Sequence, residues 1–202
     1  MEPLASLLRP KSLDDYIGQS HLVGDGKPLN LAIAKKHPFS FILWGPPGTG
    51  KTSLARIYAK ALNADYHELS AVSSGKEDIR RIVDGGNLFG PKIIFLDEIH
   101  RFNKAQQDFL LPYVENGQLI LIGATTENPS FEVIPALLSR TRVFVLESLT
   151  EDNLREIIIR ASKKNQKVID KASEDWLLRM SGGDARQMLG VLEHALELYG
   201  EV

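Results

Sequence analysis

A glycine-rich segment that contains a lysine and several hydroxyl side chains carries the clearest chemical signal in the sequence. The segment, WGPPGTGKTSLA, runs from Trp44 to Ala55 and follows a short apolar run. Glycines let a backbone curl until its N–H groups face phosphate oxygens, and a lysine adds positive charge for the β and γ phosphates. The segment therefore predicts a nucleoside triphosphate site. The predicted contacts are Gly45, Pro46, Pro47, Gly48, Thr49, Gly50, Lys51, Thr52 and Ser53.

A pair of acidic residues further along the chain is expected to bind the metal ion and to position the attacking water. Asp97 and Glu98 follow the apolar residues Ile93 to Leu96. A buried parallel strand delivers such residues to the carboxyl edge of its sheet, where a phosphate loop also lies. We expect Thr52 and Asp97 to hold Mg²⁺ and Glu98 to position the attacking water. The alternative is a pair of acids that caps the next helix, since acidic residues favour helix N-termini. A water-activating glutamate favours hydrolysis over phosphoryl transfer to a metabolite.

The elements that must position these residues alternate along the chain. Apolar runs without a polar, solvent-facing side alternate with helix-like segments. This alternation indicates a parallel sheet covered by helices on both sides. The predicted strands span residues 39–45, 66–71, 92–98, 118–126 and 143–149. The predicted fold is thus α/β, with a five-stranded parallel sheet.

The pattern changes to helices alone after residue 149. Thr150 is a good N-cap for a helix with Leu154, Ile157, Ile158 and Ala161 on one stripe, and Asp184 opens the last helix. The predicted domains are an α/β nucleotide-binding core at 1–149 and a small helical lid at 150–202.

Composition and charge limit the classes of partner that the chain is expected to bind. The 202 residues carry a formal net charge of −2, so the chain as a whole offers no basic excess for nucleic acid, and any DNA contact must be local. No apolar stretch approaches the ~20 residues of a membrane span, so no membrane partner is expected. The absence of cysteine excludes disulfides and permits a cytosolic setting.

The letters DEIH, residues 97–100, also occur in the acid boxes of nucleic-acid helicases. A helicase of that type continues into a second complete RecA-like domain, for which too few residues remain. The chain continues instead with QLILIGATTENP and then ALLSRTRVFVL. These segments resemble the AAA+ ATPases, and a helicase activity is not indicated.

Six segments carry a closer family resemblance. They are RPKSLDDYIGQSHLVG, ILWGPPGTGKTSLA, ELSAVSSGKEDIR, FLDEIHRFNKAQQDFLLPYVENG, LIGATTENPSFEVIPALLSRTRVFVL and GGDARQMLGVLE. Together they resemble the replication-associated recombination protein A family (RarA, also called MgsA), whose eukaryotic relatives include the Werner-helicase-interacting protein. The resemblance extends from Leu4 to Leu198, and HRFNKAQQD and GATTENPSFEV are its most family-specific parts.

The resemblance implies an activity and a set of partners. Members of the family are DNA-dependent ATPases that use ATP and Mg²⁺ and act at stalled or damaged replication forks. The implied partners are single-stranded or forked DNA, replication proteins such as single-stranded DNA-binding protein, and further copies of the chain. Family members form tetramers through a helical region past the lid, so the sequence is expected to be a fragment of a longer protein. The implied location is the bacterial cytoplasm, in the cytosol or nucleoid.

The resemblance also implies roles for single residues. Thr126 matches sensor 1, and Thr125 is the adjacent candidate, because successive strand residues face opposite ways. Arg140 matches the arginine finger that acts on the ATP of a neighbouring subunit, with Arg142 as a weaker candidate. Arg186 matches sensor 2, which reaches from the lid to the phosphates. A surface salt bridge for Arg140 and a solvated helix face for Arg186 are the alternatives.

Three further assignments are less sharply defined by the residues. Tyr16, Ile17 and Gly18 resemble the segment that wraps the adenine base, although such apolar residues also occur as plain core. Ser70 stands where relatives carry a polar residue that can restrain the catalytic glutamate. The basic and aromatic residues 100–104 can contact DNA, or they can serve packing and subunit contact.

Two other functions remain open at this point. A sliding-clamp-loader subunit has a similar core, and its LSRC and GDxR segments resemble LLSRT and GDAR. TTENPSFEV argues against that function. A nucleotide-dependent scaffold with little turnover is the other, and the complete set Lys51, Asp97, Glu98 and Arg140 argues against a degenerate site.

Overall fold

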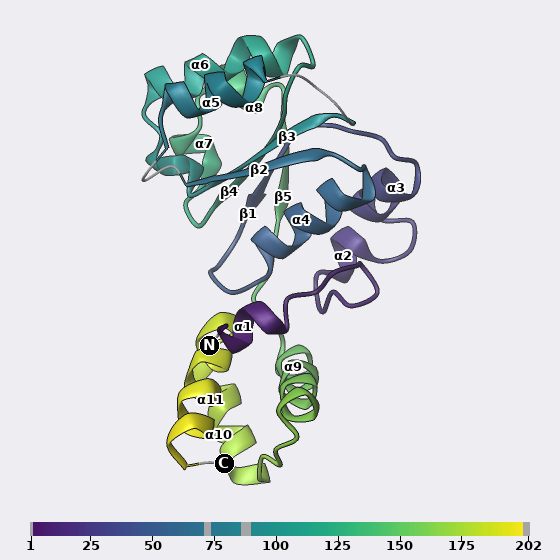
Figure 1. The fold of residues 1–202 in the computed structure, drawn as a ribbon, viewed down its shortest axis with the longest axis vertical. Coiled ribbons are helices and arrows are strands. Elements are labelled where there is room, and N and C mark those ends of the chain that lie inside the picture. Colours follow the sequence, from purple (N-terminus) through teal and green to yellow (C-terminus); the bar gives the residue numbers. More distant parts are fainter. Residues whose placement is uncertain (1, 71–73, 86–89, 200–202) are drawn as a thin grey trace. The chain divides into compact units, whose positions relative to one another are not determined.

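The computed structural model describes residues 2–70, 74–85 and 90–199 and divides the chain into two compact units (Figure 1). The α/β unit comprises Ser20–Gly45 and Lys51–Leu146. The helical unit comprises Met1–Gln19, Pro46–Gly50 and Glu147–Val202. The N-terminal segment and five residues of the glycine-rich loop thus group with the C-terminal helices. The domain boundary inferred from sequence, between residues 149 and 150, stays a prediction.

The sheet of the α/β unit has five strands, all parallel, in the order β2-β3-β4-β1-β5. The predicted fold class is therefore confirmed. The last predicted strand is shorter than expected, because the chain leaves the sheet after Val145. The end of the second predicted strand, Ala71, lies outside the described residues. The strands are β1 (Phe41–Trp44), β2 (Asp65–Ser70), β3 (Lys92–Asp97), β4 (Ile120–Thr125) and β5 (Arg142–Val145).

Helices cover both faces of this sheet (Figure 1). Alternate strand residues face opposite sides, so Ile42, Ile94 and Leu121 pack in one core with α5 and α6. On the other face, the ring of Phe41 lies 5.0 Å from that of Tyr58 on α4. The helical elements of the unit are α2 (Ser20–Val23), α3 (Pro28–Ala34), α4 (Lys51–Ala61), α5 (Lys76–Asp84), the 3-10 helix η1 (Ile99–Arg101), α6 (Lys104–Glu115), α7 (Pro129–Glu132) and α8 (Pro135–Leu138).

The helical unit has its own core. Its elements are α1 (Leu4–Leu7), α9 (Glu151–Asn165), α10 (Lys171–Ser181) and α11 (Ala185–Tyr199). Thr150 caps α9 by accepting a hydrogen bond from Asn153 N, as predicted, and Leu154, Ile158 and Ala161 are buried. Asp184 accepts from Gln187 N at the start of α11. Each cap satisfies a backbone N–H that lacks a partner in the first helical turn.

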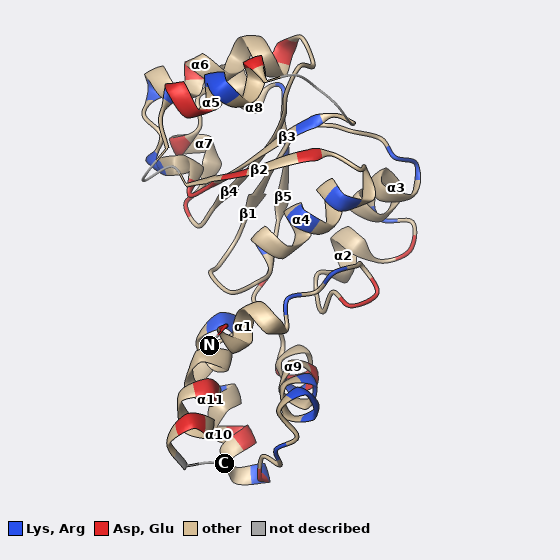
Figure 2. Cartoon of the chain, viewed as in Figure 1, with Lys and Arg blue, Asp and Glu red and all other residues tan. Residues whose placement is uncertain are grey.

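Charged residues of both signs are interspersed along each unit (Figure 2). This distribution agrees with the formal net charge of −2. Among the described helices, none has the length and apolar character needed to cross a membrane.

Tyr58 gives the α/β unit a pH-dependent stability. Its side chain is fully buried, its hydroxyl donates to His37 O at 2.9 Å and accepts from Phe39 N at 3.0 Å, and burial raises its pKa from 10.0 to about 12. A raised pKa means that the unfolded tyrosine ionises first, so this contribution is complete below pH 10.0 and is lost as the pH rises to about 12.

The Tyr58→Phe substitution is expected to destabilise the protein near neutral pH and to flatten its alkaline stability curve. Loss of the hydroxyl leaves the amide of Phe39 without its partner, which costs roughly 1–3 kcal/mol. Urea unfolding of both proteins between pH 7 and pH 12 measures the two effects. Parallel curves for the two proteins above pH 10 would show that Tyr58 does not carry the pH dependence.

Candidate functional site

The two ends of the glycine-rich segment belong to the α/β unit. Gly45 directly follows β1, and its N–H donates to Thr125 O at the end of β4, at 3.1 Å. Lys51 begins α4 and is only 9% exposed, with its Nζ donating to Gly45 O at 2.7 Å. A lysine is rarely this buried unless its ammonium has partners, and the N-terminus of a helix favours anions. These features suit the binding of a phosphate.

The middle of the segment, Pro46–Gly50, belongs to the helical unit and leaves no room for side chains at its glycines. Gly48 has φ +68°, and a Cβ there would lie 1.7 Å from Asp184 Oδ1. Gly50 has φ +97°, and a Cβ there would lie 2.6 Å from the hydroxyl of Tyr16. The same hydroxyl donates to Thr49 O at 3.3 Å, and burial raises the pKa of Tyr16 well above its usual value. Tyr16 and Asp184 therefore fix the shape of the loop.

The acidic pair lies at the carboxyl end of β3, as predicted from sequence. Asp97 is the last residue of the strand, in register with Ser70 of β2. Glu98 follows it in the left-handed conformation, with φ 56° and ψ 47°. A non-glycine residue in this region is uncommon and costs of the order of 1 kcal/mol or more, and such residues concentrate at functional sites. This backbone conformation sets the direction in which the Glu98 side chain leaves the strand.

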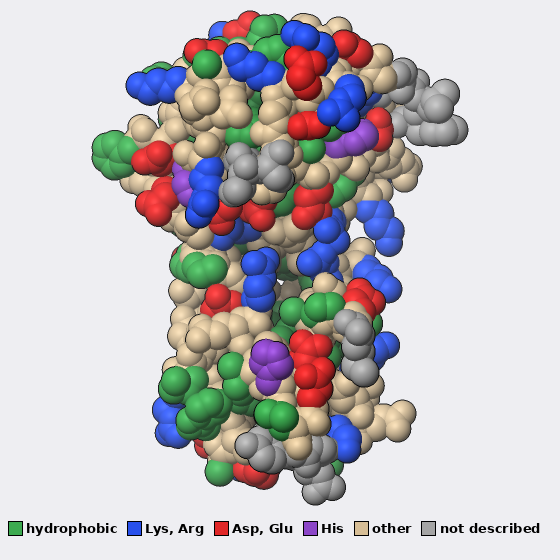
Figure 3. All heavy atoms as spheres, turned by 60° about the vertical axis from the view of Figure 1, so that its left-hand side comes forward, with side chains coloured by type: hydrophobic (Ala, Val, Ile, Leu, Met, Phe, Trp, Pro, Cys, Tyr) green, Lys and Arg blue, Asp and Glu red, His purple; other side chains and the backbone are tan. Residues whose placement is uncertain are grey.

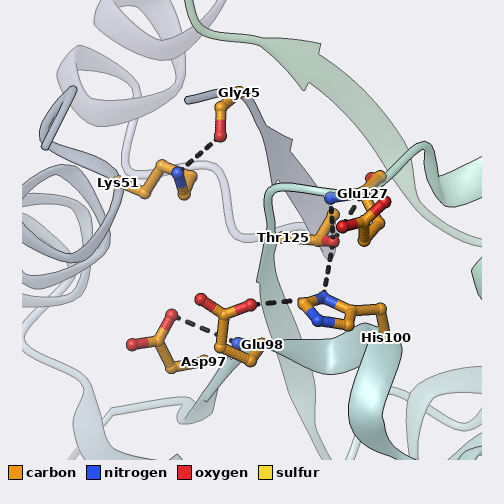
Figure 4. A network of polar contacts seen from close by, with 7 residues as sticks. All are labelled: Gly45, Lys51, Asp97, Glu98, His100, Thr125 and Glu127. Atoms are coloured by element: carbon orange, nitrogen blue, oxygen red, sulfur yellow. Dashed lines mark hydrogen bonds and ion pairs between the residues drawn. The ribbon is translucent and has the colours of Figure 1, made fainter. Parts of the chain in front are cut away.

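A histidine links Glu98 to the end of β4 (Figure 4). His100 Nδ1 lies 3.2 Å from Glu98 Oε2 and 2.9 Å from Thr125 Oγ1. The buried Thr125 hydroxyl also accepts from Glu127 N at 2.9 Å and donates to Glu127 O at 3.2 Å. Its hydrogen-bonding capacity is thus used within the chain. Thr126, just past the strand end, is exposed. Thr126 therefore suits a sensor of bound nucleotide better than Thr125 does.

Figure 4 shows Lys51, Asp97 and Glu98 gathered where β1, β3 and β4 end. A family model for the AAA proteins, the ATPase family associated with various cellular activities, matches residues 41–149, which include all three. The chain belongs to the AAA family of ATPases.

Curated AAA relatives agree with the resemblance predicted from sequence. Replication-associated recombination protein A of Haemophilus influenzae is 47% identical over 98% of this chain and 47% of its own length. The protein of the same name from Escherichia coli K12 is 45% identical over 95% of this chain and 45% of its own length. ATPase WRNIP1 of Dictyostelium discoideum is 48% identical over 96% of this chain and 23% of its own length. The chain thus spans about half the length of the bacterial relatives.

Solved structures support the same fold. The Thermotoga maritima RuvB Holliday junction branch migration motor is 30% identical to this chain, with a TM-score of 0.78 over 96% of this chain and 68% of RuvB. A point variant of the same RuvB gives the same TM-score at 31% identity, again over 96% of this chain and 68% of RuvB. The chain therefore has the P-loop fold of AAA proteins.

The AAA arginine-finger candidate, Arg140, lies just past α8 on the surface. It pairs with Glu115 at 2.6 Å, the two side chains being 40% and 45% exposed, and also donates to Ala136 O. An ion pair this exposed is worth at most about 1 kcal/mol, so Arg140 can exchange it for a stronger partner. Arg142, the weaker candidate, lies over the ring of Phe39 at 4.8 Å. This contact lies within the same chain.

Gln107 is a buried side chain that the sequence did not single out. Its side chain is 1% exposed, donates to Phe102 O and Glu132 O, and accepts from Ile134 N, all at 2.9 Å. One amide thus joins α6 to the connection between α7 and α8, the segment that leads to Arg140. A buried glutamine whose three contacts are all to backbone is costly to replace. Its position in the family-specific segment HRFNKAQQD was the only signal available.

The adenine-contact candidates lie in the helical unit. Tyr16 is buried, Ile17 is half-buried, and Gly18 has φ +81°. Gln19, absent from the predicted set, has a buried amide that donates to Glu147 O at 2.7 Å and accepts from Glu147 N at 2.9 Å. This pair of bonds holds the candidate segment to the chain just before α9.

Two remaining predictions concern surface residues. Arg186, the sensor 2 candidate, is exposed on the first turn of α11. Within residues 100–104, Phe102 is buried and Asn103 caps α6 by exchanging hydrogen bonds with Gln106. Packing and capping thus account for Phe102 and Asn103, while Arg101 and Lys104 are exposed. The roles of all site residues in binding and catalysis stay predictions.

Proposed function

We propose that this chain is the ATP-hydrolysing module of a protein that acts on DNA at stalled or damaged replication forks. The observation that carries the proposal is the convergence of Lys51, Asp97 and Glu98 at the carboxyl edge of a parallel sheet, in a chain related to replication-associated recombination protein A. Ligands bind at this edge in open α/β sheets, beside the strand where the strand order reverses.

The residues of the site fit ATP and Mg²⁺. Backbone N–H groups of a glycine-rich loop can contact phosphates, and Lys51 at the start of α4 adds a buried positive charge. Thr52 and Asp97 offer the hard oxygen ligands that Mg²⁺ prefers, and Mg²⁺ usually binds through one or two such side chains together with phosphate oxygens. When bound, Mg²⁺ neutralises the charge that develops on the phosphates.

The reaction we propose is hydrolysis of ATP to ADP and phosphate. Glu98 would accept a hydrogen bond from the attacking water and align it with the γ-phosphate. Thr126, the exposed hydroxyl after β4, would hold the same water or a γ-phosphate oxygen. Arg140 would leave Glu115 and stabilise the transition state at the site of a neighbouring copy. Arg186 is proposed as sensor 2.

The proposed oligomer and DNA partner are supported by surface features and by relatives. Hydrophobic side chains gather on the face of the helical unit seen in Figure 3, which suits a protein contact. The exposed large hydrophobic residues of this unit are Leu7, Ile159, Val168, Trp176, Met180 and Leu198. The relatives' names refer to replication, recombination and branch migration, so single-stranded or forked DNA is the proposed substrate, and replication proteins are the proposed partners. The location we propose is the bacterial cytoplasm, which the match to bacterial relatives supports.

The test is ATP turnover measured with and without single-stranded and forked DNA. We expect Mg²⁺-dependent turnover that DNA stimulates. The Lys51→Ala substitution removes charge-assisted hydrogen bonds worth about 1.5–3 kcal/mol, so ATP binding should weaken about 10- to 100-fold. Lys60→Ala, on an exposed position of the same helix, is the matched control and should bind ATP normally.

Each competing function predicts a different result in this experiment. A nucleotide-dependent scaffold would bind ATP through Lys51 without measurable turnover. A clamp-loader subunit would need a sliding clamp for full stimulation, and DNA alone would have little effect. Equal ATP affinity in Lys51→Ala and Lys60→Ala would remove the phosphate-binding role of Lys51.

A further inference from the structure

Arg140 is attached to a helix that is too short to hold its own position. α8 has only four residues, and a single helical turn is not stable in isolation. Arg140 N donates to Leu137 O at 3.1 Å, and its Nη1 donates to Ala136 O at 2.7 Å. The backbone and the guanidinium of Arg140 are therefore both bonded to α8. The position of the guanidinium depends on how α8 is attached to the rest of the α/β unit.

Ile134, the N-cap of α8, is the residue through which the start of this helix is bonded to α6. Ile134 O accepts from Leu137 N and Leu138 N, both at 3.0 Å, which closes the helical turn. The N–H of an N-cap residue has no acceptor inside its own helix, and Ile134 N donates instead to Gln107 Oε1 at 2.9 Å. Ile134 is buried, so this N–H would be costly to leave without an acceptor.

The amide of Gln107 can be oriented in only one way. Nε2 carries two hydrogens and donates to Phe102 O and Glu132 O, each at 2.9 Å, while Oε1 accepts from Ile134 N. An inverted amide would place its oxygen against two carbonyls and its hydrogens against an N–H. The side chain is 1% exposed, so water cannot take the place of these partners.

Apolar packing holds α8 beside α6 without fixing its orientation (Figure 1). Val133, Ile134 and Leu137 lie in the same buried core as Leu110 of α6. The hydrophobic effect is not directional, whereas a hydrogen bond weakens steeply as its angle departs from linear. The hydrogen bonds at the start of α8 therefore restrict its orientation more closely than the packing does.

Glu115 provides a second contact between α6 and Arg140, about two turns and roughly 12 Å further along the helix than Gln107. This ion pair is exposed, and in the proposed reaction it breaks when Arg140 moves to the ATP of a neighbouring copy. The bonds of Gln107 are buried and need not break in that step. They can keep the start of α8 in place while the guanidinium changes its partner.

The segment that follows Glu98 depends less on Gln107. Arg101 N donates to Glu98 O at 2.8 Å, and Phe102 N donates to the carbonyl three residues before it at 3.1 Å. Loss of the Gln107 amide removes one hydrogen bond from this segment, at Phe102 O. The same loss removes two hydrogen bonds from the connection between α7 and α8. The larger effect is therefore expected at α8.

We propose that Gln107 is the positioning residue for Arg140. Its amide fixes the start of α8 on α6, and so determines where the guanidinium arrives when it leaves Glu115 for a neighbouring ATP. This role rests on the proposed ATP hydrolysis and on the action of Arg140 at the neighbouring site. Gln107 itself touches neither the nucleotide nor the guanidinium in this proposal, and acts through the backbone of α8.

Mixed oligomers separate an effect on the arginine from an effect on the glutamate. One subunit carries Glu98→Gln with Arg140 intact and the other carries Arg140→Ala with Glu98 intact, so only one kind of interface is active. Gln107→Met, which keeps a side chain of similar size without its hydrogen bonds, is added to one subunit at a time. In the subunit that supplies the arginine, it should lower kcat about 10- to 100-fold, the cost of misplacing a catalytic group by about 1 Å. In the subunit that supplies the glutamate, it should lower kcat by less than about threefold.

The two mixtures contain the same substituted chain, so a general loss of stability lowers turnover in both and cannot imitate the expected difference. Gln107→Glu, which keeps the acceptor for Ile134 N but in its ionised form donates to neither carbonyl, is measured in the same two positions. Gln118→Met makes the same change as Gln107→Met at an exposed position and should have no effect in either subunit. Equal losses in the two mixtures, no loss in either, or the larger loss in the subunit that supplies the glutamate would overturn the inference.

Amide hydrogen exchange is a second measurement, and it does not depend on turnover. In Gln107→Met, the amides of Ile134 and Arg140 should exchange about tenfold faster than in wild type, as expected for the loss of roughly one hydrogen bond. Exchange at Arg101 and Phe102 should change by less than about threefold. Unchanged exchange at Arg140, or equal acceleration in both segments, would overturn the inference. Absence of ATP turnover in the wild-type protein would instead contradict the proposed function, and the exchange rates would still decide whether Gln107 holds α8.

Discussion

The Glu98→Gln substitution is expected to reduce ATP turnover by about 10²- to 10⁴-fold, the usual contribution of a positioned general base. Glutamine has nearly the same shape as glutamate and keeps a hydrogen-bond acceptor, but it cannot take a proton from water. The dissociation constant for ATP should stay within about threefold, because the phosphate contacts come from the glycine-rich loop and Lys51. Steady-state phosphate release and equilibrium titration of ATP measure the two quantities on the same preparation.

The matched control for Glu98→Gln is Asp108→Asn, which makes the same chemical change at an exposed position of α6. This variant should hydrolyse ATP at the wild-type rate. Turnover of Glu98→Gln within about threefold of the control would show that Glu98 does not activate the water. Equal loss in both variants would point to a general effect of charge on the preparation.

The Arg140→Ala substitution is expected to have the other largest effect, a loss of roughly 10³-fold or more in the turnover of the oligomer, as arginine fingers contribute in phosphoryl transfer. The structure shows the guanidinium on the surface, held by the exposed Glu115 and by the carbonyl of Ala136. Its release costs little, while a triphosphate offers a stronger, charge-assisted contact. ATP turnover of the assembled protein measures the effect.

Mixed oligomers show whether Arg140 acts on its own site or on a neighbour's. Subunits with Arg140→Ala but an intact Glu98 are mixed with subunits carrying Glu98→Gln and an intact Arg140. Action on the neighbour predicts that mixing restores turnover, since an intact finger then meets an intact glutamate across the interface. Failure of mixing to restore any activity, in oligomers shown to contain both subunits, would disprove action in trans. Arg142→Ala, whose arginine is stacked on Phe39, should leave turnover within about threefold.

Much of the fold could be predicted from sequence because its signals are local. Strands buried on both faces appear as apolar runs, and the spacing of WGPPGTGKT places its lysine at the start of a helix. The caps at Thr150 and Asp184 are also local signals, since each side chain bonds an N–H three residues away. The five-stranded parallel sheet and the three helices after residue 149 follow from such patterns.

The supporting contacts of the site could not be predicted, because they join residues that are distant in sequence. Gln107 bonds to Ile134, Gln19 to Glu147, and His100 to Thr125. No spacing rule in the sequence identifies a glutamine or histidine that bonds to a residue far away along the chain. The choice between Thr125 and Thr126 as sensor 1 could not be made from the sequence for the same reason. Alternation along the strand says that only one can face the nucleotide, but the contacts of His100 and Glu127 are needed to show that Thr125 is already engaged.

The most direct test of ATP hydrolysis by this protein follows the fate of ATP bound to the wild-type protein in a single turnover. Protein in excess is mixed with γ-³²P-labelled ATP, with or without Mg²⁺, and quenched at intervals. Hydrolysis of ATP predicts that the label appears as inorganic phosphate only when Mg²⁺ is present, with one ADP formed for each phosphate. Bound ATP that stays intact in the presence of Mg²⁺ and DNA, or label that appears on an acceptor other than water, would contradict it.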